Sequence, residues 1–177
     1  ASINFRDLKI IRGTYARKPA LPVVILSDGA GEVIAVGKKV KRFSEGDRVM
    51  PIYMSGWHDG PISERHSGWK GLGGDTDGTA TELAVFHEED VAAIPNSLSY
   101  EEAACIPCAG VTAWHALISS GRIKAGDDVL ILGSGGVSIF GLQIALMNGA
   151  RVLAISSNDK KLEKLRELGA SITINYK

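Results

Sequence analysis

The stretch VLILGSGGVSIFG, residues 129–141, places a glycine cluster directly after an apolar run. Gly133 and Gly135 occupy the first two places of the pattern G-x-G-x-x-G, and Ser138 occupies the third. Between a strand and a helix, the first glycine allows a tight turn and the second lets the backbone approach a pyrophosphate. The helix N-terminus then offers unpaired N–H groups to the phosphates. The alternative is a glycine-rich turn that holds no ligand.

The third place of the pattern normally serves close packing of the helix on the strand. Ser138 is small enough to allow nearly the same packing. Gly141, one helical turn later, also lets the helix lie close to the strand.

The elements around this cluster alternate between strands and helices. The apolar residues 128–132 predict a strand, and residues 137–147 predict a helix that is apolar nearly all round. RVLAIS (151–156) predicts a second strand, and SITIN (171–175) a third. Between them lies an amphipathic helix with Leu162, Leu165 and Leu168 on one face, ended by Gly169. The pattern predicts an α/β fold with a parallel sheet and right-handed crossovers, which favours dinucleotide binding over an empty turn.

The end of the second predicted strand indicates which dinucleotide binds. An NAD-binding unit carries Asp or Glu there for the ribose 2′-OH, whereas this chain has Ser156 and Ser157. Small hydroxyl groups leave room for a 2′-phosphate, and Lys160 and Lys161 add positive charge. We therefore expect NADP(H), with NAD(H) as the alternative. The lysines could equally solvate the outer face of their helix, and Asp159 partly offsets their charge.

Before residue 100 the chain is rich in glycine and β-forming residues. We expect strand structure in residues 29–40, 45–53, 79–86 and 91–95, separated by a long glycine-rich loop at residues 54–78. Ser99 and Glu102 then form a capping-box pattern that begins a helical run, which Gly121 ends.

Two cysteines form the pattern C-I-P-C at Cys105 and Cys108. A structural zinc site needs about four ligands, and the sequence holds no second cysteine pair. A redox pair is expected in a thioredoxin-like context, which is absent here. We therefore expect buried, reduced cysteines.

Composition excludes several classes of partner. The 20 basic residues balance 20 acidic ones, so no net charge favours nucleic acid or an anionic membrane. No apolar run approaches the roughly 20 residues that span a bilayer, and the chain opens without a signal sequence, so the cytoplasm is the expected location. The expected partner is a small-molecule substrate.

Four motifs, in this order and spacing, carry a resemblance to a known family: ASINFRDL, SDGAGEVIAVGKKVKRFSEGDRV, LSYEEAACIPCAGVTAWHAL and VLILGSGGVSIFGLQIA. The sequence resembles the medium-chain dehydrogenase/reductase superfamily, in its zinc-free branch of quinone oxidoreductases and alcohol-dehydrogenase-like proteins. The resemblance implies a GroES-like β-rich catalytic domain over residues 1–107. It also implies the first half of a Rossmann NAD(P)-binding domain over residues 108–177.

The implied reaction is hydride transfer between a nicotinamide cofactor and a carbonyl, alcohol, quinone or activated alkene. The resemblance also implies that the full-length protein is a homodimer. The chain would then lack the family's first segment and the second half of its Rossmann sheet, so we expect the 177-residue chain alone to show little turnover. The alternative function is a catalytically silent nucleotide-binding sensor, because a fold does not determine an activity.

Residue roles follow from the same resemblance. The zinc-containing branch has a cysteine at the position of Asn4 and a His–Glu pair at the positions of Ser27 and Asp28. Cys108 falls at the position of the third zinc ligand, but one thiolate cannot hold the ion, so we expect no zinc. Asn4 is then a candidate for orienting substrate or nicotinamide, and Asp7 for bracing the local helix.

Thr112 matches a position beside the nicotinamide, unless its hydroxyl bonds back within its own helix. Lys161 and Tyr176 match positions near the phosphate and the adenosine. The expected cofactor-binding residues are Gly133, Ser134, Gly135, Gly136, Val137, Ser156, Ser157, Lys161 and Tyr176.

Overall fold

The computed structural model describes residues 1–61, 68 and 70–177. The chain separates into two compact units, Ala1–Cys108 and Ala109–Lys177, each described here by itself. The sequence placed this division between residues 107 and 108.

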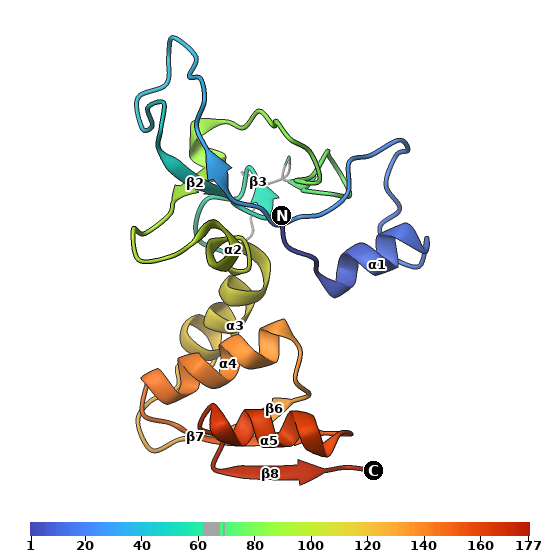
Figure 1. The fold of residues 1–177 in the computed structure, drawn as a ribbon, viewed down its shortest axis with the longest axis vertical. Helices are drawn as coiled ribbons and strands as arrows, with labels where there is room; N and C mark the ends of the chain where they lie inside the picture. Colours follow the sequence, from blue (N-terminus) through green and yellow to red (C-terminus); the bar gives the residue numbers. More distant parts are fainter. Residues whose placement is uncertain (62–67, 69) are drawn as a thin grey trace. The chain divides into compact units, whose positions relative to one another are not determined.

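The second unit is built on a parallel sheet (Figure 1). Its strands lie in the order β6-β7-β8, and Val129 is paired with Val152 and Ala154 with Thr173. The predicted α/β alternation is confirmed, and β6 and β7 have the predicted bounds. The elements are α3 (Val111–Trp114), a π-helical segment η4 (His115–Ser120), β6 (Asp128–Leu132), α4 (Gly136–Met147), β7 (Arg151–Ser156), α5 (Asp159–Glu167) and β8 (Ile172–Asn175).

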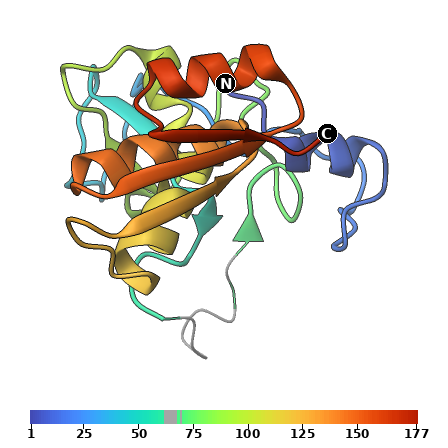
Figure 2. The same ribbon diagram turned by 90° about the horizontal axis from the view of Figure 1, so that it is seen from below.

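Helices α4 and α5 cover one face of this sheet (Figure 2). Val129 and Ile131 of β6 are buried, whereas the alternate residue Leu132 is 67 % exposed. The strand is therefore buried on one face only, because successive side chains of a strand point to opposite sides.

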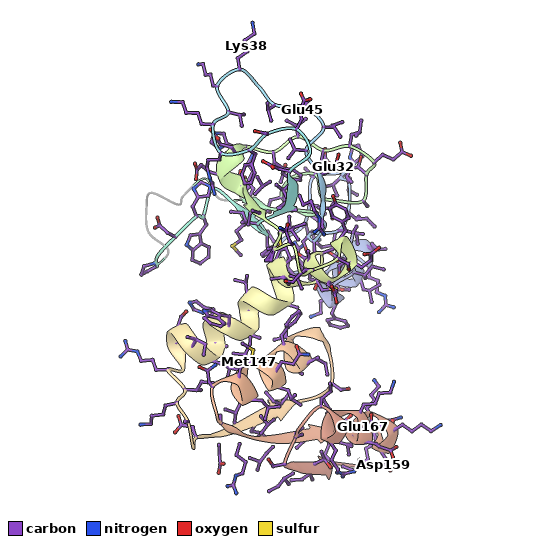
Figure 3. All side chains as sticks on the ribbon, turned by 60° about the vertical axis from the view of Figure 1, so that its left-hand side comes forward. Glu32, Lys38, Glu45, Met147, Asp159 and Glu167 are labelled. Carbon is purple, nitrogen blue, oxygen red and sulfur yellow. The ribbon has the colours of Figure 1, made fainter. Side chains whose placement is uncertain are left out.

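On α5, Leu162 and Leu165 are buried as expected, but Leu168 is 42 % exposed. Leu168, expected on the same face, is the C-cap residue, because the helix ends at Glu167. Figure 3 labels Asp159 and Glu167 at the two ends of α5.

The first unit contains short antiparallel strands. β1, β2 and β5 form one sheet in the order β1-β2-β5, and β3 pairs with β4. The elements are α1 (Phe5–Ile11), β1 (Gly31–Glu32), β2 (Arg48–Pro51), β3 (Met54–Ser55), β4 (Lys70–Gly71), the 3-10 turn η2 (Glu88–Asp90), β5 (Val91–Ala93), α2 (Tyr100–Ala103) and the π-helical segment η3 (Ile106–Gly110), which extends to the first residues of the second unit.

Two strand predictions in this unit are corrected. Only Gly31–Glu32 is a strand within residues 29–40, and a long loop, labelled by Lys38 and Glu45 in Figure 3, connects it to β2. Within the described part of the chain, residues 79–86 form no strand, and Leu83 and Val85 are exposed. A strand needs a hydrogen-bonded neighbour on at least one side, and β propensity alone does not supply it. The predicted loop 54–78 contains β3 and β4, and its residues 62–67 and 69 lie outside the described residues.

The predicted capping box at Ser99 is confirmed. Its Oγ accepts a hydrogen bond from the Glu102 N–H at 3.1 Å, and Glu102 Oε2 accepts one from the Ser99 N–H at 2.8 Å. Gly121 ends the helical run, and its N–H donates to the Ala116 carbonyl at 2.9 Å.

Glycines allow residues 24–29 to lie directly against residues 78–80. The N–H groups of Gly78 and Thr79 donate to the carbonyls of Val24 and Leu26, at 2.8 and 2.9 Å. A Cβ atom on Gly78 would lie 1.9 Å from the Leu26 carbonyl oxygen, and one on Gly29 would lie 2.9 Å from Thr79 Cβ. The contact that positions Ser27 and Asp28 therefore requires glycine on both sides.

Replacing Gly78 should destabilise the protein strongly. In Gly78→Ala the new methyl group meets backbone rather than a flexible side chain, so we expect a loss of about 3 kcal/mol in the free energy of unfolding. Chemical denaturation of the full-length protein measures this loss. Gly31→Ala is the control, because a Cβ atom there meets nothing within 4 Å. Equal stability of the two variants would contradict this account of the contact.

Candidate functional site

The site in the first unit begins at the N-terminus of α1. Asn4 is the N-cap residue, and its backbone N–H donates to Asp7 Oδ2 at 2.7 Å. Asp7 is buried, so its carboxylate fixes the first turn of the helix. The prediction that Asp7 braces the local helix is confirmed.

The side chain of Asn4 reaches the predicted Ser27–Asp28 pair. Its Nδ2 donates to Asp28 Oδ2 at 2.9 Å and lies 3.3 Å from Ser27 Oγ. The Cys108 N–H donates to the same Asp28 oxygen at 3.2 Å. These residues occupy the four positions that the sequence comparison with the zinc-containing branch singled out, and the structure brings all four together.

The backbone of Asp28 is held as firmly as its side chain. Its carbonyl accepts hydrogen bonds from the Ser2 N–H at 2.9 Å and from Thr79 Oγ1 at 2.7 Å. Asp28 therefore joins three segments of the chain: the start of α1, residues 78–80 and the helical segment η3, which contains Cys108.

Burial makes Asp28 an unusual acid. Its side chain is 0 % exposed, and its Oδ1 atom is buried without a hydrogen bond. Burial, with a smaller contribution from the nearby charge of Asp7, raises the pKa of Asp28 to about 6, although the hydrogen bonds from Asn4 and Cys108 act to lower it. The pKa of Asp7 is also raised, because of burial. Asp28 therefore keeps its proton to a higher pH than an exposed Asp does.

Arg6 is the cation beside these two carboxyl groups. Its guanidinium carbon lies over the rings of Tyr15 and Tyr53, 5.1 and 4.8 Å from their centroids. Its Nη1 donates to the Leu72 carbonyl at 2.9 Å. It also lies 3.5 Å from Asp7 Oδ1. The interaction with Arg6 lowers the pKa of Tyr15, whereas burial raises the pKa of Tyr53.

Sequence reasoning missed the roles of Arg6, Asp28 and Tyr53. A role for Arg6 could have been predicted, because Arg6 and Asp7 are adjacent charges among apolar residues at the start of a helix. Tyr53 carried no such signal, because only the fold brings it against Arg6.

The donor set at this site does not suit zinc. Asn4 and Ser27 offer a neutral amide and a hydroxyl, and the amide already donates to Asp28. Burial raises the pKa of the Cys108 thiol to about 11, and Asp28 adds to the shift, so the thiolate that zinc needs is disfavoured. Among the described residues, no group of three or more His, Cys, Asp or Glu side chains could hold a metal ion.

The prediction of buried cysteines is wrong, although both are free thiols. Cys105 is exposed and Cys108 is only half-buried. The Cys105 Sγ lies 3.5 Å from Ser2 Oγ and 3.4 Å from the Glu101 carbonyl oxygen.

In the second unit, the glycine cluster forms the turn from β6 into α4. Gly133 has φ +87°, a conformation that favours glycine. Gly135 has φ −81° and is the N-cap of α4, and a Cβ atom on it would meet nothing within 4 Å. The chain's own packing therefore does not require glycine at residue 135, and the open space beside it suits the close approach of a phosphate group.

Two further residues of the pattern help to fix the turn. Ser138 Oγ donates to the Leu132 carbonyl at 3.0 Å, which ties the first turn of α4 to the end of β6. A Cβ atom on Gly141 would lie 3.2 Å from Ile131 Cδ1, so this glycine supplies the close contact between helix and strand.

The other expected cofactor residues lie at the same edge of the sheet, because the carboxyl ends of parallel strands meet there. The Gly133 N–H donates to the Ile155 carbonyl at 2.9 Å, and the Tyr176 N–H donates to the Ser156 carbonyl at 3.2 Å. Ser156 is only 4 % exposed, so it lies beneath this edge, whereas Lys161 is exposed.

The remaining predicted residues lie around the same elements. Ser134, Gly136 and Val137 form the turn and the start of α4, and Ser157 follows β7. Thr112 is exposed on α3, in the second unit, whereas Asn4 belongs to the first. No helix in the described part of the chain is long and apolar enough to cross a membrane.

Comparison with known families gives one match over residues 1–96, to the family described as the alcohol dehydrogenase GroES-like domain. A zinc-type alcohol dehydrogenase-like protein from Schizosaccharomyces pombe is 46 % identical over all of this chain and 51 % of its own length. A quinone oxidoreductase from Pseudomonas aeruginosa is 32 % identical over 98 % of this chain and 47 % of its own. The chain therefore spans about half the length of these relatives.

Solved structures agree with these sequence matches. A crystal structure of an NAD-dependent alcohol dehydrogenase superposes with a TM-score of 0.88 and 36 % identity, over 99 % of this chain and 53 % of its own. The GroES-like fold and the partial parallel sheet expected from the sequence are thereby confirmed.

The raised pKa of Asp28 should make stability depend on pH. The folded protein keeps this proton to about pH 6, whereas an unfolded Asp loses it near pH 3.8. The free energy of unfolding should therefore fall as the pH rises through this window, by up to about 3 kcal/mol. In Asp28→Asn, which keeps the acceptor for Asn4 and Cys108, this part of the fall should disappear.

Chemical denaturation of the full-length protein between pH 4 and 8 measures the effect, and at pH 8 the variant should be the more stable protein. The exposed Glu45→Gln is the control for removing a carboxylate (Figure 3). A variant that follows the wild-type pH dependence would show that Asp28 titrates normally.

Proposed function

The chain belongs to the alcohol dehydrogenase GroES-like family of medium-chain dehydrogenases/reductases, and on that premise we propose that the full-length protein is a zinc-independent, NADP(H)-dependent oxidoreductase. Its substrate is a carbonyl, quinone or activated alkene in the reducing direction, or an alcohol in the other. The observation that carries the proposal is the set Asn4, Ser27, Asp28 and Cys108. Hydrogen bonds join these residues at the positions that the resemblance equates with the ligands of the zinc-containing branch.

The nicotinamide cofactor supplies the hydride when it is bound. The residues that would hold it are Gly133–Val137, at the N-terminus of α4, and Ser156, Ser157, Lys161 and Tyr176 at the same edge of the sheet. The exposed N–H groups and the positive end of α4 favour the pyrophosphate, and the open space beside Gly135 admits it.

Residues of the first unit would handle the proton. Reduction of a carbonyl leaves negative charge on its oxygen, which must receive a proton. Asp28, whose pKa is about 6, is protonated in a minor fraction of molecules at neutral pH and is the proposed donor of that proton. Asn4 positions Asp28, because its Nδ2 donates to the Asp28 carboxyl group. A direct contact between Asn4 and the substrate stays a prediction. Arg6, close to both carboxyl groups, keeps the charge of the deprotonated pair partly balanced.

The second candidate is a cofactor-binding protein without turnover. The observation in its favour is the engagement of the Asn4 amide with Asp28 and Ser27, which directs this donor to the protein rather than to a substrate.

Turnover by the full-length protein tests the main proposal. Quinones, enones and aldehydes are offered with NADPH or NADH after dialysis against a chelator, and we expect oxidation of the cofactor by at least one class. Elemental analysis of the same sample should find well under one zinc per chain. Binding of cofactor without any oxidation would favour the sensor. Activity that is lost with zinc and restored by it would overturn the zinc-independent proposal.

Cofactor preference should depend on Lys161. Because its ammonium group would meet the 2′-phosphate, Lys161→Gln should weaken NADPH binding about three- to tenfold and leave NADH binding unchanged. Lys164→Gln, one turn further along α5, removes the same charge from an exposed side chain and should change neither affinity. Fluorescence titration of the full-length protein measures both. A wild type that prefers NADH, or equal effects of the two variants, would contradict the proposed NADP(H) preference.

A further inference from the structure

Two side chains at the cofactor edge of the second unit are hydrogen-bonded to each other. Asn175 is the last residue of β8, and Asp159 is the first residue of α5 (Figure 3). Asn175 Nδ2 donates to Asp159 Oδ1 at 2.8 Å. Neither residue belongs to the expected cofactor-binding set, so this contact has no role in the function proposed above.

The strand register places Asn175 beside that set. Asn175 is paired with Ser156 in the parallel pair β7–β8. The next residue, Tyr176, donates its N–H to the Ser156 carbonyl at 3.2 Å. Asn175 therefore lies at the level of the sheet where the end of the second strand meets the adenosine ribose in a dinucleotide-binding unit.

The orientation of the Asn175 amide group follows from its two neighbours. Its Oδ1 accepts a hydrogen bond from the Lys177 N–H at 3.0 Å, and a backbone N–H can only donate. An ionised carboxylate can only accept, so the NH2 end of the amide faces Asp159. Both ends of the amide are thereby engaged, and its NH2 group holds the Asp159 carboxylate toward β8.

The direction of the Asp159 carboxylate matters because of its charge. Asp159 is the acidic residue closest in sequence to Ser156, three positions further along the chain. A carboxylate that faced a 2′-phosphate would repel it, whereas one that faced a ribose 2′-OH would accept its hydrogen bond. The hydrogen bond to Asn175 occupies one oxygen of Asp159, so the positive charge of the exposed Lys161 is less opposed.

We propose that Asn175 is a positioning residue that favours NADP(H) over NAD(H) by holding the Asp159 carboxylate away from the 2′-phosphate. The inference rests on the proposed function and adds a determinant of specificity to the same cofactor site. Without the Asn175 amide, the exposed Asp159 side chain can turn toward Ser156 and the ribose. Because both side chains are exposed, water and salt weaken their interaction, so its removal changes the affinity severalfold and does not abolish binding.

A double-mutant cycle tests this role, by fluorescence titration of the full-length protein with NADPH and with NADH. In Asn175→Ala, the ratio of NADPH affinity to NADH affinity should fall about threefold. In the Asp159→Asn background, adding Asn175→Ala should leave this ratio unchanged, because no carboxylate remains to be positioned. The ratio separates this effect from a general loss of structure, which would weaken the binding of both nucleotides alike.

The control for the removed charge is Glu163→Gln. This variant removes a carboxylate from an exposed position one turn further along α5, and its ratio should equal that of the wild type. An unchanged ratio in Asn175→Ala would overturn the proposal. A fall that persists in the Asp159→Asn background would also overturn it, since Asn175 would then act without Asp159.

The same titrations distinguish this proposal from the proposed function. A wild type that prefers NADH would contradict the NADP(H) assignment. A ratio that still falls in Asn175→Ala, and only while Asp159 is present, would even then support the role of Asn175. Conversely, a wild type that prefers NADPH but keeps its ratio in Asn175→Ala would leave the proposed function intact and exclude Asn175 from it. A wild type that binds neither nucleotide would overturn both.

Discussion

The burial of the Asp28 carboxyl group is the constraint on which the first unit depends. One oxygen accepts hydrogen bonds from Asn4 Nδ2 and the Cys108 N–H, and the other is buried without one. Burying a charge with so few partners is costly, so the group holds its proton to a higher pH than usual. The same contacts hold the start of α1 and the helical segment η3 against it. The group that organises the local structure is thereby also the carboxyl group whose pKa burial raises to about 6.

In the second unit the important feature is an open backbone surface at the Gly133–Gly135 turn, where the cofactor is expected to bind. Its hydrophobic core lies between one face of the sheet and the helices α4 and α5, and includes Leu142, Val152 and Leu165. This packing brings the ends of β6, β7 and β8 to one edge, with the Gly133–Gly135 turn at the start of α4. Rigid elements therefore carry the expected cofactor residues, which is the arrangement that a bound dinucleotide needs.

Much of the second unit could be predicted because its signals are local. The bounds of β6 and β7 follow from short apolar runs, and the turn at Gly133 follows from its glycines. Residues 79–86 were expected to form a strand and do not, because strand formation depends on a neighbouring segment. The environment of Asp28 could not be predicted for a related reason: its partners Asn4 and Cys108 are 24 and 80 residues away in the sequence. The motifs indicated which residues correspond to metal ligands in the zinc-containing branch. Only the fold shows the hydrogen bonds that join these residues.

The ionisation of Asp28 itself is the most direct test of this account. In the full-length protein labelled with ¹³C at the aspartate carboxyl carbons, NMR spectra recorded between pH 3 and 8 follow each side chain, and the resonance missing from Asp28→Asn identifies Asp28. The account predicts a midpoint near pH 6 for that resonance. A midpoint at or below the ordinary value of 3.8 would mean that Asp28 is a fully ionised carboxylate at neutral pH, and would contradict its assignment as the proton-exchanging group.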